Sequence, residues 1–143
     1  MAKSSINILK NCAGFSHNDR SEKKQPEYFL PVEFRKENEF DRNGIEAQKL
    51  LDSYIKEAKE NYKKETGQKF QGRVLNFEAV VNLNQNHTME DLKKLNENIE
   101  KEFGFRAVQT AIHRDEGHIK DGRPIYNYHA HIMFTGRQID LET

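Results

Sequence analysis

The chain has 143 residues, a length that fits one domain and is enough to bury a core. Hydrophobic residues make up 35% of it, charged residues make up 32%, and nine Phe and five Tyr supply rings for a core, so the composition excludes a disordered chain. Lys plus Arg and Asp plus Glu both number 23. This formal neutrality argues against a protein that coats DNA without sequence preference, but it is compatible with an enzyme that has a local basic groove.

Targeting signals are not visible in the sequence. No stretch approaches the length of an apolar membrane span, and the N-terminus lacks the apolar run of a signal peptide. Cys12 is the only cysteine, so an internal disulfide is impossible. These features predict a cytoplasmic protein, because reducing compartments do not favour disulfides.

The N-terminal half contains one predicted strand, a long connection and one predicted helix. Residues 4–10 have apolar residues flanked by polar ones, which indicates a strand. Residues 11–43 are polar and irregular, and their length predicts a segment that is functional or partly structured. Residues 45–66 form a predicted helix that ends at Gly67, because apolar residues recur at three- and four-residue steps. Its Lys- and Glu-rich face is typical of a solvated surface.

The C-terminal half contains three predicted strands and a second helix. Residues 73–83 alternate and are rich in β-formers, which predicts a central strand. Thr88 is placed to cap a helix that ends at Gly104. Residues 105–113 and 125–135 are two further predicted strands, joined by a polar loop with two glycines and a proline.

This order of elements predicts a single α+β domain over residues 1–143. We expect a two-layer sandwich in which a central, mostly antiparallel sheet carries its helices on one face. The last two strands should lie near the centre of the sheet, because they are the most apolar.

Three histidines form the most informative cluster. His129 and His131 project from the same face of a strand, with Cα atoms roughly 7 Å apart, and the hairpin returns His113 toward them. Three neutral imidazoles with open positions predict a catalytic metal site rather than a closed structural one. Asp115 and Glu116 lie close to His113 in sequence, so either is a candidate fourth ligand or a group that orients a ligand. His87 and His118 lie in polar segments and are predicted to be exposed.

A second motif, Phe-Ser-His-Asn-Asp-Arg at residues 15–20, follows the first strand. Its His-Asn-x-Arg resembles motif I of the MobV relaxases, the Pre/Mob plasmid mobilisation proteins of the HUH endonuclease superfamily. That family also carries His-x-Asp-Glu followed by His-x-His, which residues 113–116 and 129–131 match in the same order. Residues 76–81 resemble its central strand. Two segments depart from the family pattern: residues 117–128 make a longer connection than usual, and the polar segment after the first motif, which includes Tyr28, is poorly matched.

The resemblance covers residues 6–135 and implies both a fold and a chemistry. It implies a central antiparallel sheet with a divalent ion, Mn²⁺ or Mg²⁺, held by histidines on the middle strands. The implied reaction is transesterification on single-stranded DNA at an origin of transfer, with a covalent 5′-phospho-protein intermediate. Relaxosome accessory proteins and a coupling protein are the further partners implied. Because mobilisation proteins usually continue, we expect the chain to be the N-terminal part of a longer protein.

The resemblance also implies roles for individual residues. His17 is the first candidate nucleophile, because neutral imidazole is nucleophilic near its pKa of about 6.5. Glu78 could orient the ring of His17, while Arg20, together with Asn18, is expected to contact DNA, with Arg20 on a phosphate. Tyr28 is the second candidate nucleophile, because most relaxases outside this family use tyrosine. His113, His129, His131 and Glu116 are the candidate metal ligands.

Three other interpretations stay open at this point. A rolling-circle replication initiator or a single-strand transposase would share the histidine pair and the nicking chemistry. A non-catalytic DNA-binding domain stabilised by a metal would need a closed four-ligand site and would have no need of His17. A small cytosolic α+β protein with incidental histidines is the least specific alternative.

Overall fold

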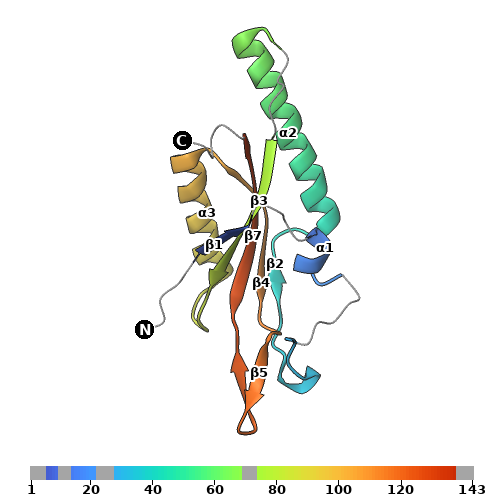
Figure 1. Ribbon diagram of the computed structural model, residues 1–143, viewed down its shortest axis with the longest axis vertical. Coiled ribbons are helices and arrows are strands. Elements are labelled where there is room, and N and C mark those ends of the chain that lie inside the picture. The colour runs from blue at the N-terminus through green and yellow to red at the C-terminus, as the bar shows by residue number, and fades with distance from the viewer. Residues whose placement is uncertain (1–5, 10–13, 22–27, 69–73, 138–143) are drawn as a thin grey trace.

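The computed structural model describes residues 6–9, 14–21, 28–68 and 74–137 (Figure 1). Its elements follow one another as β1 (Ile6–Leu9), α1 (Phe15–Asn18), the 3₁₀ turn η1 (Val32–Phe34), β2 (Glu39–Phe40), α2 (Gly44–Thr66), β3 (Val74–Asn82), α3 (Met89–Phe103), β4 (Arg106–His113), β5 (Gly117–Lys120), β6 (Arg123–Tyr126) and β7 (His129–Arg137). The predicted strands and helices are therefore present where the structure describes them, except that the strand predicted over residues 125–135 is divided between β6 and β7. Residues 4, 5, 10 and 73 of the predicted strands lie outside the described residues.

The main sheet has five strands in the order β1-β3-β7-β4-β2, and every neighbouring pair is antiparallel. β7 lies at its centre, with β3 on one side and β4 on the other. The prediction that the last two long strands occupy the middle of an antiparallel sheet is thus confirmed. Their apolar content explains the position, because central strands are covered on both faces.

The two faces of β7 differ in character, and each meets a different helix. Ala130, Ile132 and Phe134 point to the face on which α3 packs, whereas His129, His131 and Met133 point to the other. α3 and the sheet form the expected two-layer sandwich. α2 departs from the prediction that the helices share one face, because Ala47 and Leu51 pack against Val108 and Met133 on the opposite side (Figure 1).

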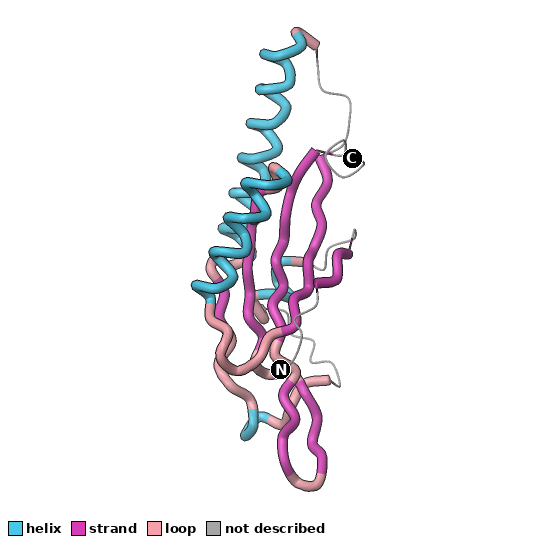
Figure 2. The backbone as a smooth tube through the Cα atoms, turned by 90° about the vertical axis from the view of Figure 1, so that its left-hand side faces the viewer, coloured by secondary structure: helices cyan, strands magenta, loops and turns pink. Residues whose placement is uncertain are grey.

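Only the first turns of α2 are covered by the sheet. Asn43 begins the helix with a capping box that includes Glu46, and Gly67 ends it at φ 72°. Ala47 and Leu51 are its buried residues, while the later turns run past the end of the sheet (Figure 2). The charged face predicted to be solvated is therefore exposed. The first turn also anchors α1, because the Gly44 amide donates to the Asp19 carboxylate at 2.7 Å.

The connection between β4 and β7 differs from the prediction. The expected strand over residues 125–135 is interrupted at Asn127 and Tyr128, and β6 pairs with β5 in a separate two-stranded ribbon (Figure 1). The backbone groups of these two residues form hydrogen bonds outside the main ladder. The Asn127 amide donates to the Glu116 carbonyl, and the Leu83 amide donates to the Tyr128 carbonyl, both at 2.9 Å. The long segment before α2 is partly structured, as expected, since it holds α1, η1 and β2.

Among the described residues, no helix has the length and apolarity needed to cross a membrane.

Candidate metal centre

Three histidines meet on the sheet face on which α2 also packs. His113 ends β4 opposite His129 on β7, and His131 follows two positions later on the same face. One ligand atom from each ring lies within 4.8 Å of the other two. His113 is fully buried at 0% exposure, and His129 is also buried, whereas His131 is half-buried. The predicted convergence is confirmed, and the group could hold a metal ion.

Each of the three rings is oriented by an oxygen that can only accept. The contacts are His113 Nε2 to the Asn18 carbonyl at 2.7 Å, His129 Nδ1 to the Asn127 carbonyl at 2.8 Å, and His131 Nδ1 to Glu78 Oε1 at 2.9 Å. The nitrogen facing such an oxygen must carry the hydrogen, so in a neutral ring the other nitrogen keeps its lone pair. The lone pairs at His113 Nδ1, His129 Nε2 and His131 Nε2 are therefore the ones available to a metal.

The spacing of two of these nitrogens fits a single ion. His113 Nδ1 and His129 Nε2 are 3.4 Å apart. Two nitrogens that each lie about 2.1 Å from one ion at a tetrahedral angle would be separated by ~3.4 Å. Two lone pairs that face each other at this distance repel, and a divalent ion between them would remove the repulsion, so this pair of donors fits a divalent ion.

Glu116 lies beside this site, as predicted for a candidate ligand. Its Oε2 is 3.2 Å from His129 Nε2 and 3.4 Å from His113 Nδ1. The same oxygen also accepts from Arg20 Nη2, which donates to Asp115 Oδ1 at 2.8 Å. Glu116 is therefore shared between the histidines and a guanidinium, and its role as a ligand stays a prediction.

Arg20 makes internal contacts through its Nη2 atom, and the phosphate contact predicted for it stays a prediction. Its guanidinium binds both carboxylates of the Asp115–Glu116 pair and lies 4.6 Å from the centre of the Phe29 ring. Its side chain is largely buried, with 15% exposure. In this arrangement Arg20 positions Glu116 beside the imidazoles.

The charges in the site bias where protons bind. Burial by itself would raise the pKa of Glu116, but the polar contacts of its carboxylate with His113, His129 and Arg20 hold that pKa far below its ordinary value. Burial lowers the pKa of His113. Burial also opposes a charge on His129, but the Glu116 carboxylate outweighs it and raises the pKa of His129. A proton therefore competes with a metal ion more strongly at His129 than at His113.

The Glu78 carboxylate accepts hydrogen bonds from His131 and Asn18. It is 2% exposed on β3, and its two oxygens accept from His131 Nδ1 at 2.9 Å and from Asn18 Nδ2 at 3.2 Å. Burial would raise the pKa of Glu78, but these contacts outweigh it and lower that pKa. Glu78 pairs with Met133 across the ladder, so it lies diagonally beside His131 on the same face. It therefore orients a candidate ligand, His131, and its predicted role toward His17 stays a prediction.

Asn18 also has a role that differs from the prediction. It was expected to contact DNA, but it is 1% exposed and lies under the site. Its side-chain amide donates to Glu78, and its backbone carbonyl accepts from His113. Asn18 is thus a positioning residue for two sides of the histidine cluster. Asn127 is a further positioning residue, which the sequence reasoning missed because its contact is made by a backbone carbonyl.

His17 lies next to the three histidines. Its ring centroid is 6.1 Å from that of His131 and 6.3 Å from that of His113. The second candidate nucleophile, Tyr28, is 44% exposed, and its ring packs against Phe29 with centroids 5.3 Å apart. The structure therefore brings the first candidate into ring-to-ring range of the site.

The other two described histidines lie outside this cluster. His118 is exposed on β5, as predicted. His87 differs from its prediction, because it is half-buried and its Nδ1 accepts from the Asn84 amide at 2.9 Å. His87 thus closes a turn before α3.

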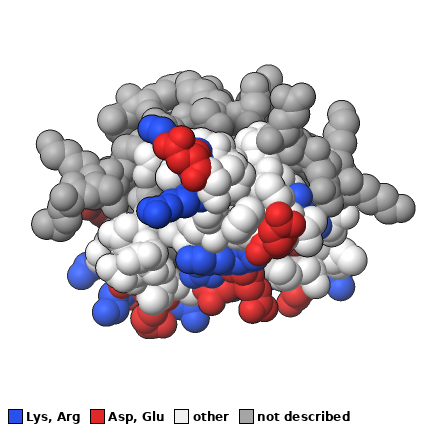
Figure 3. All heavy atoms as spheres, turned by 90° about the horizontal axis from the view of Figure 1, so that it is seen from below, with Lys and Arg blue, Asp and Glu red and all other residues white. Residues whose placement is uncertain are grey.

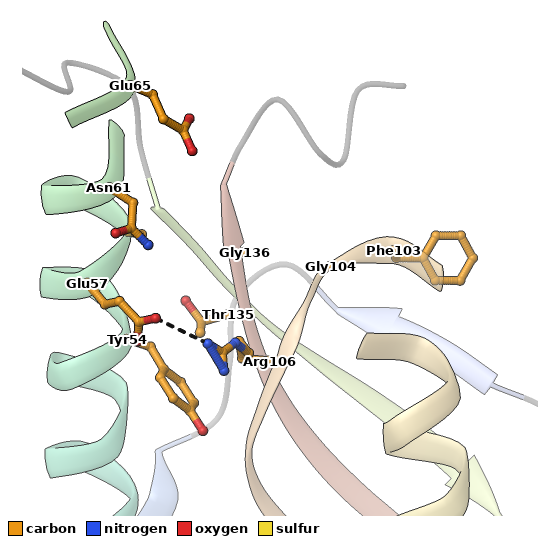
Figure 4. Close-up of a pocket in the computed structure, with 10 residues that line it drawn as sticks. Tyr54, Glu57, Asn61, Glu65, Phe103, Gly104, Arg106, Thr135 and Gly136 are labelled. Carbon is orange, nitrogen blue, oxygen red and sulfur yellow. Dashed lines mark hydrogen bonds and ion pairs between the residues drawn. The ribbon is translucent and has the colours of Figure 1, made fainter. Parts of the chain in front are cut away.

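A separate cavity of about 270 Å³ lies at the other end of the sheet, between α2, the end of α3 and the strands β4 and β7 (Figure 4). Arg106 is the cation within it, and it already pairs with Glu57 at 3.4 Å and lies 4.7 Å from the centre of the Tyr54 ring. None of the lining residues belongs to the histidine cluster. The cavity and the candidate metal centre are therefore independent features.

Comparison with known proteins yields no family model, no curated protein and no solved structure that matches this chain.

Proposed function

We propose that this chain is the nicking domain of a plasmid relaxase, which cuts one strand of DNA at an origin of transfer and stays joined to the new 5′ phosphate. The observation that carries the proposal is the set of three imidazoles whose lone pairs converge, with His17 as a fourth ring beside them. Single-stranded DNA is the substrate, and the accessory and coupling proteins of mobilisation are the further partners of the proposal.

The site has the features expected of a catalytic metal centre. Three histidines leave coordination positions open, and half-buried His131 gives the site an accessible side. A bound divalent ion would neutralise the non-bridging oxygens of the scissile phosphate and fix it for in-line attack. His113, His129 and His131 would hold this ion, and three imidazoles favour Mn²⁺ over Mg²⁺, which prefers oxygen ligands.

The proposed reaction assigns the covalent step to His17. A ring nitrogen of His17 forms a bond to phosphorus, and the bond from phosphorus to the 3′ oxygen breaks. The leaving oxygen gains a proton, and the imidazole loses the proton of its second nitrogen, so charge is balanced. The phosphoramidate conserves the strand's bond energy, and rejoining is the reverse transfer.

The neighbouring residues keep the site in a reactive arrangement. Glu78, Asn18 and Asn127 hold the hydrogens of the three rings away from the metal position. Arg20 holds Glu116 at the edge of the site. None of these contacts needs to change during the reaction, so the site is organised before DNA binds.

The test is a search for the covalent adduct. The protein is incubated with Mn²⁺ and a labelled library of single-stranded oligonucleotides of random sequence, and the products are separated on a denaturing gel. We expect a labelled band that migrates with the protein, requires Mn²⁺, and disappears in His17→Ala. A chelator added before the DNA should abolish the band.

A second candidate function is a non-catalytic DNA-binding domain with a structural metal. The position of Glu116, 3.2 Å from His129 Nε2, favours it, because this carboxylate could close a four-ligand site. Tight Mn²⁺ or Zn²⁺ binding that raises the Tm, without any adduct under any condition, would select this candidate over the relaxase.

A further inference from the structure

The cavity at the end of the sheet is a feature that the histidine cluster does not explain. It has a volume of about 270 Å³ and lies between the later turns of α2 and the ends of α3, β4 and β7 (Figure 4). Thr135 on its wall follows His131 by four residues, which is about 13 Å along an extended strand. A ligand in the cavity would therefore not touch the proposed metal position.

One wall of the cavity is a polar row on α2. Glu57, Asn61 and Glu65 recur at four-residue steps, so they share one face of the helix, with about 6 Å of axial rise between neighbours. Figure 4 shows the three side chains directed toward the strands. Within the part of the chain that the structure describes, the Asn61 and Glu65 side chains have no hydrogen-bond or ion-pair partner. The row therefore offers acceptor oxygens to a ligand.

The opposite wall holds a buried hydroxyl without a partner. Thr135 follows Met133 by two positions on β7, so its side chain points to the face on which α2 packs. Thr135 is 3% exposed and lines the cavity, and Figure 4 shows its oxygen directed toward the helix. Among the described residues its Oγ1 has no hydrogen-bond partner. A buried hydroxyl in this state destabilises the free protein, and a ligand that donates to it would supply the missing contact.

The charges of the lining favour a cation. Arg106 already has two partners, since it pairs with Glu57 at 3.4 Å and lies 4.7 Å from the centre of the Tyr54 ring. The lining places the carboxylates of Glu57 and Glu65 against this single guanidinium, so its net charge is negative. An anion would have to displace Glu57 from Arg106 and would then face Glu65. A cation meets the unpaired Glu65 carboxylate directly.

The size of the cavity favours a single side chain. Pockets for small molecules and cofactors usually measure about 300–1,000 Å³, and this cavity is smaller. A long basic side chain would fill it with its alkyl stem and its charged head. Phe103 lies at the rim with 55% exposure. Because aromatic residues are enriched in protein interfaces, this ring favours a partner protein as the source of the side chain.

We propose that the cavity receives an arginine side chain from a partner protein. A guanidinium has five donors in a planar fork, so one group can serve acceptors on both walls. These acceptors are the Glu65 carboxylate, the Asn61 side-chain oxygen and the Thr135 hydroxyl. The residues that flank the arginine pack on Phe103. Binding here needs neither metal nor DNA, so it does not depend on the proposed function.

The distribution of charge over the rest of the molecule makes this contact local. Seen from the ribbon end, Lys and Arg side chains lie next to Asp and Glu side chains (Figure 3). The chain as a whole is formally neutral. A surface of mixed charge does not attract a basic partner over a long distance, so the cavity itself provides the specificity.

The experiment is an NMR titration of the full chain with short peptides, without added metal. The probe is the blocked tripeptide acetyl-Gly-Arg-Gly-amide. Its matched control has citrulline in place of arginine, which keeps the shape and removes the charge. The backbone amides of Gly104, Arg106 and Gly136 report on the cavity. Free L-arginine is the third ligand, because a site for a small molecule would accept it equally well.

We expect the arginine peptide to shift these amides with a Kd on the order of 1 mM, and the citrulline peptide to bind at least about tenfold more weakly. Glu65→Gln should weaken binding of the arginine peptide about fivefold. Glu60→Gln, on an exposed part of α2 outside the cavity, should have no effect. Thr135→Val should weaken binding and raise the Tm of the free protein, because the unpaired hydroxyl is removed. Thr135→Ser keeps the hydroxyl and should bind like the unmodified protein.

Several results would overturn the inference. They are equal binding of the arginine and citrulline peptides, equal effects of Glu65→Gln and Glu60→Gln, or the absence of any shift at the cavity amides. Equally tight binding of free L-arginine would make a small molecule the ligand in place of a partner protein. Tighter binding of acetyl-Gly-Glu-Gly-amide would assign the cavity to an anion held by Arg106.

Discussion

Replacing Glu78 by glutamine tests how the centre is organised, because it removes a charge and keeps the shape. The carboxylate accepts from His131 on one oxygen and from the Asn18 amide on the other. Glutamine offers one acceptor and one NH₂ group. The Asn18 Oδ1 atom is buried and lacks a hydrogen-bond partner. A rotation of the Asn18 amide would let this oxygen accept from the new NH₂ group, so both contacts survive in Glu78→Gln.

The expected magnitudes follow from these contacts. Loss of a group that orients a metal ligand lowers metal affinity by about 10- to 100-fold, which is ~1.4–2.8 kcal/mol. We place Glu78→Gln near tenfold, because the hydrogen bond to His131 stays and only the charge is lost. Glu78→Ala should approach 100-fold. It should also lower the free energy of unfolding by roughly 1–3 kcal/mol, because the buried donors of His131 and Asn18 lose their acceptor.

The assay is calorimetric titration with Mn²⁺ alongside chemical denaturation of the metal-free protein. Glu60→Gln, an exposed glutamate of α2, is the control and should bind Mn²⁺ normally. The folded pKa of Glu78 is lowered, so its stabilising contribution is present above the unfolded pKa and disappears as pH falls through the folded value. The stability difference between the unmodified protein and Glu78→Gln should therefore shrink in acid. Unchanged Mn²⁺ affinity in both Glu78 variants would refute the assigned orientation of His131.

The remaining predictions concern the ligands, the nucleophile and pH. His131→Ala should abolish tight Mn²⁺ binding and adduct formation while circular dichroism shows the fold intact; normal Mn²⁺ affinity would mean that the site is misassigned. His17→Ala should bind DNA and metal without forming an adduct, whereas Tyr28→Phe should still form one, and the adduct should be acid-labile. An acid-stable adduct that is lost only in Tyr28→Phe would reverse the assignment. Mn²⁺ binding should weaken on acidification from a pH above about 6.5, the ordinary histidine pKa, because the pKa of His129 is raised; a midpoint well below that value would contradict this. Single-stranded DNA should react faster than relaxed linear duplex, because unpairing costs a few kcal/mol per step, and equal rates in a gel assay would exclude this preference.

Much of the framework followed from patterns that are local in sequence. The three- and four-residue apolar period identified α2 and α3, two-residue alternation identified β3, and apolar content identified β4. The same alternation placed His129 and His131 on one face, which the structure confirms. Such features depend on a few neighbouring residues, so a single sequence is enough to recognise them.

The features that the sequence did not reveal depend on contacts between distant segments. α2 covers the sheet face that carries Val108 and Met133. The alternation of side chains along β4 and β7 shows that the sheet has two apolar faces, but it does not show which helix packs on which face. The strand break at residues 127–128 falls between apolar Ile125–Tyr126 and the His-x-His segment, so hydropathy alone continues across it. The sequence also does not show that Asp115 and Glu116 both contact Nη2 of Arg20.

The positioning contacts make the metal centre a product of the whole fold. The three orienting oxygens come from α1, from β3 and from the residue that joins the ribbon to β7. Without these contacts each imidazole would populate more than one tautomer and rotamer. Each additional state lowers the fraction of molecules in which the ring is ready to bind an ion. The first turn of α2 holds α1 through Asp19, and Arg20 ties the end of α1 to Glu116. The three histidines therefore form a metal site only when the sheet, α1 and the base of the β5–β6 ribbon are all in place. The affinity for a metal ion is a measure of how completely these elements are assembled.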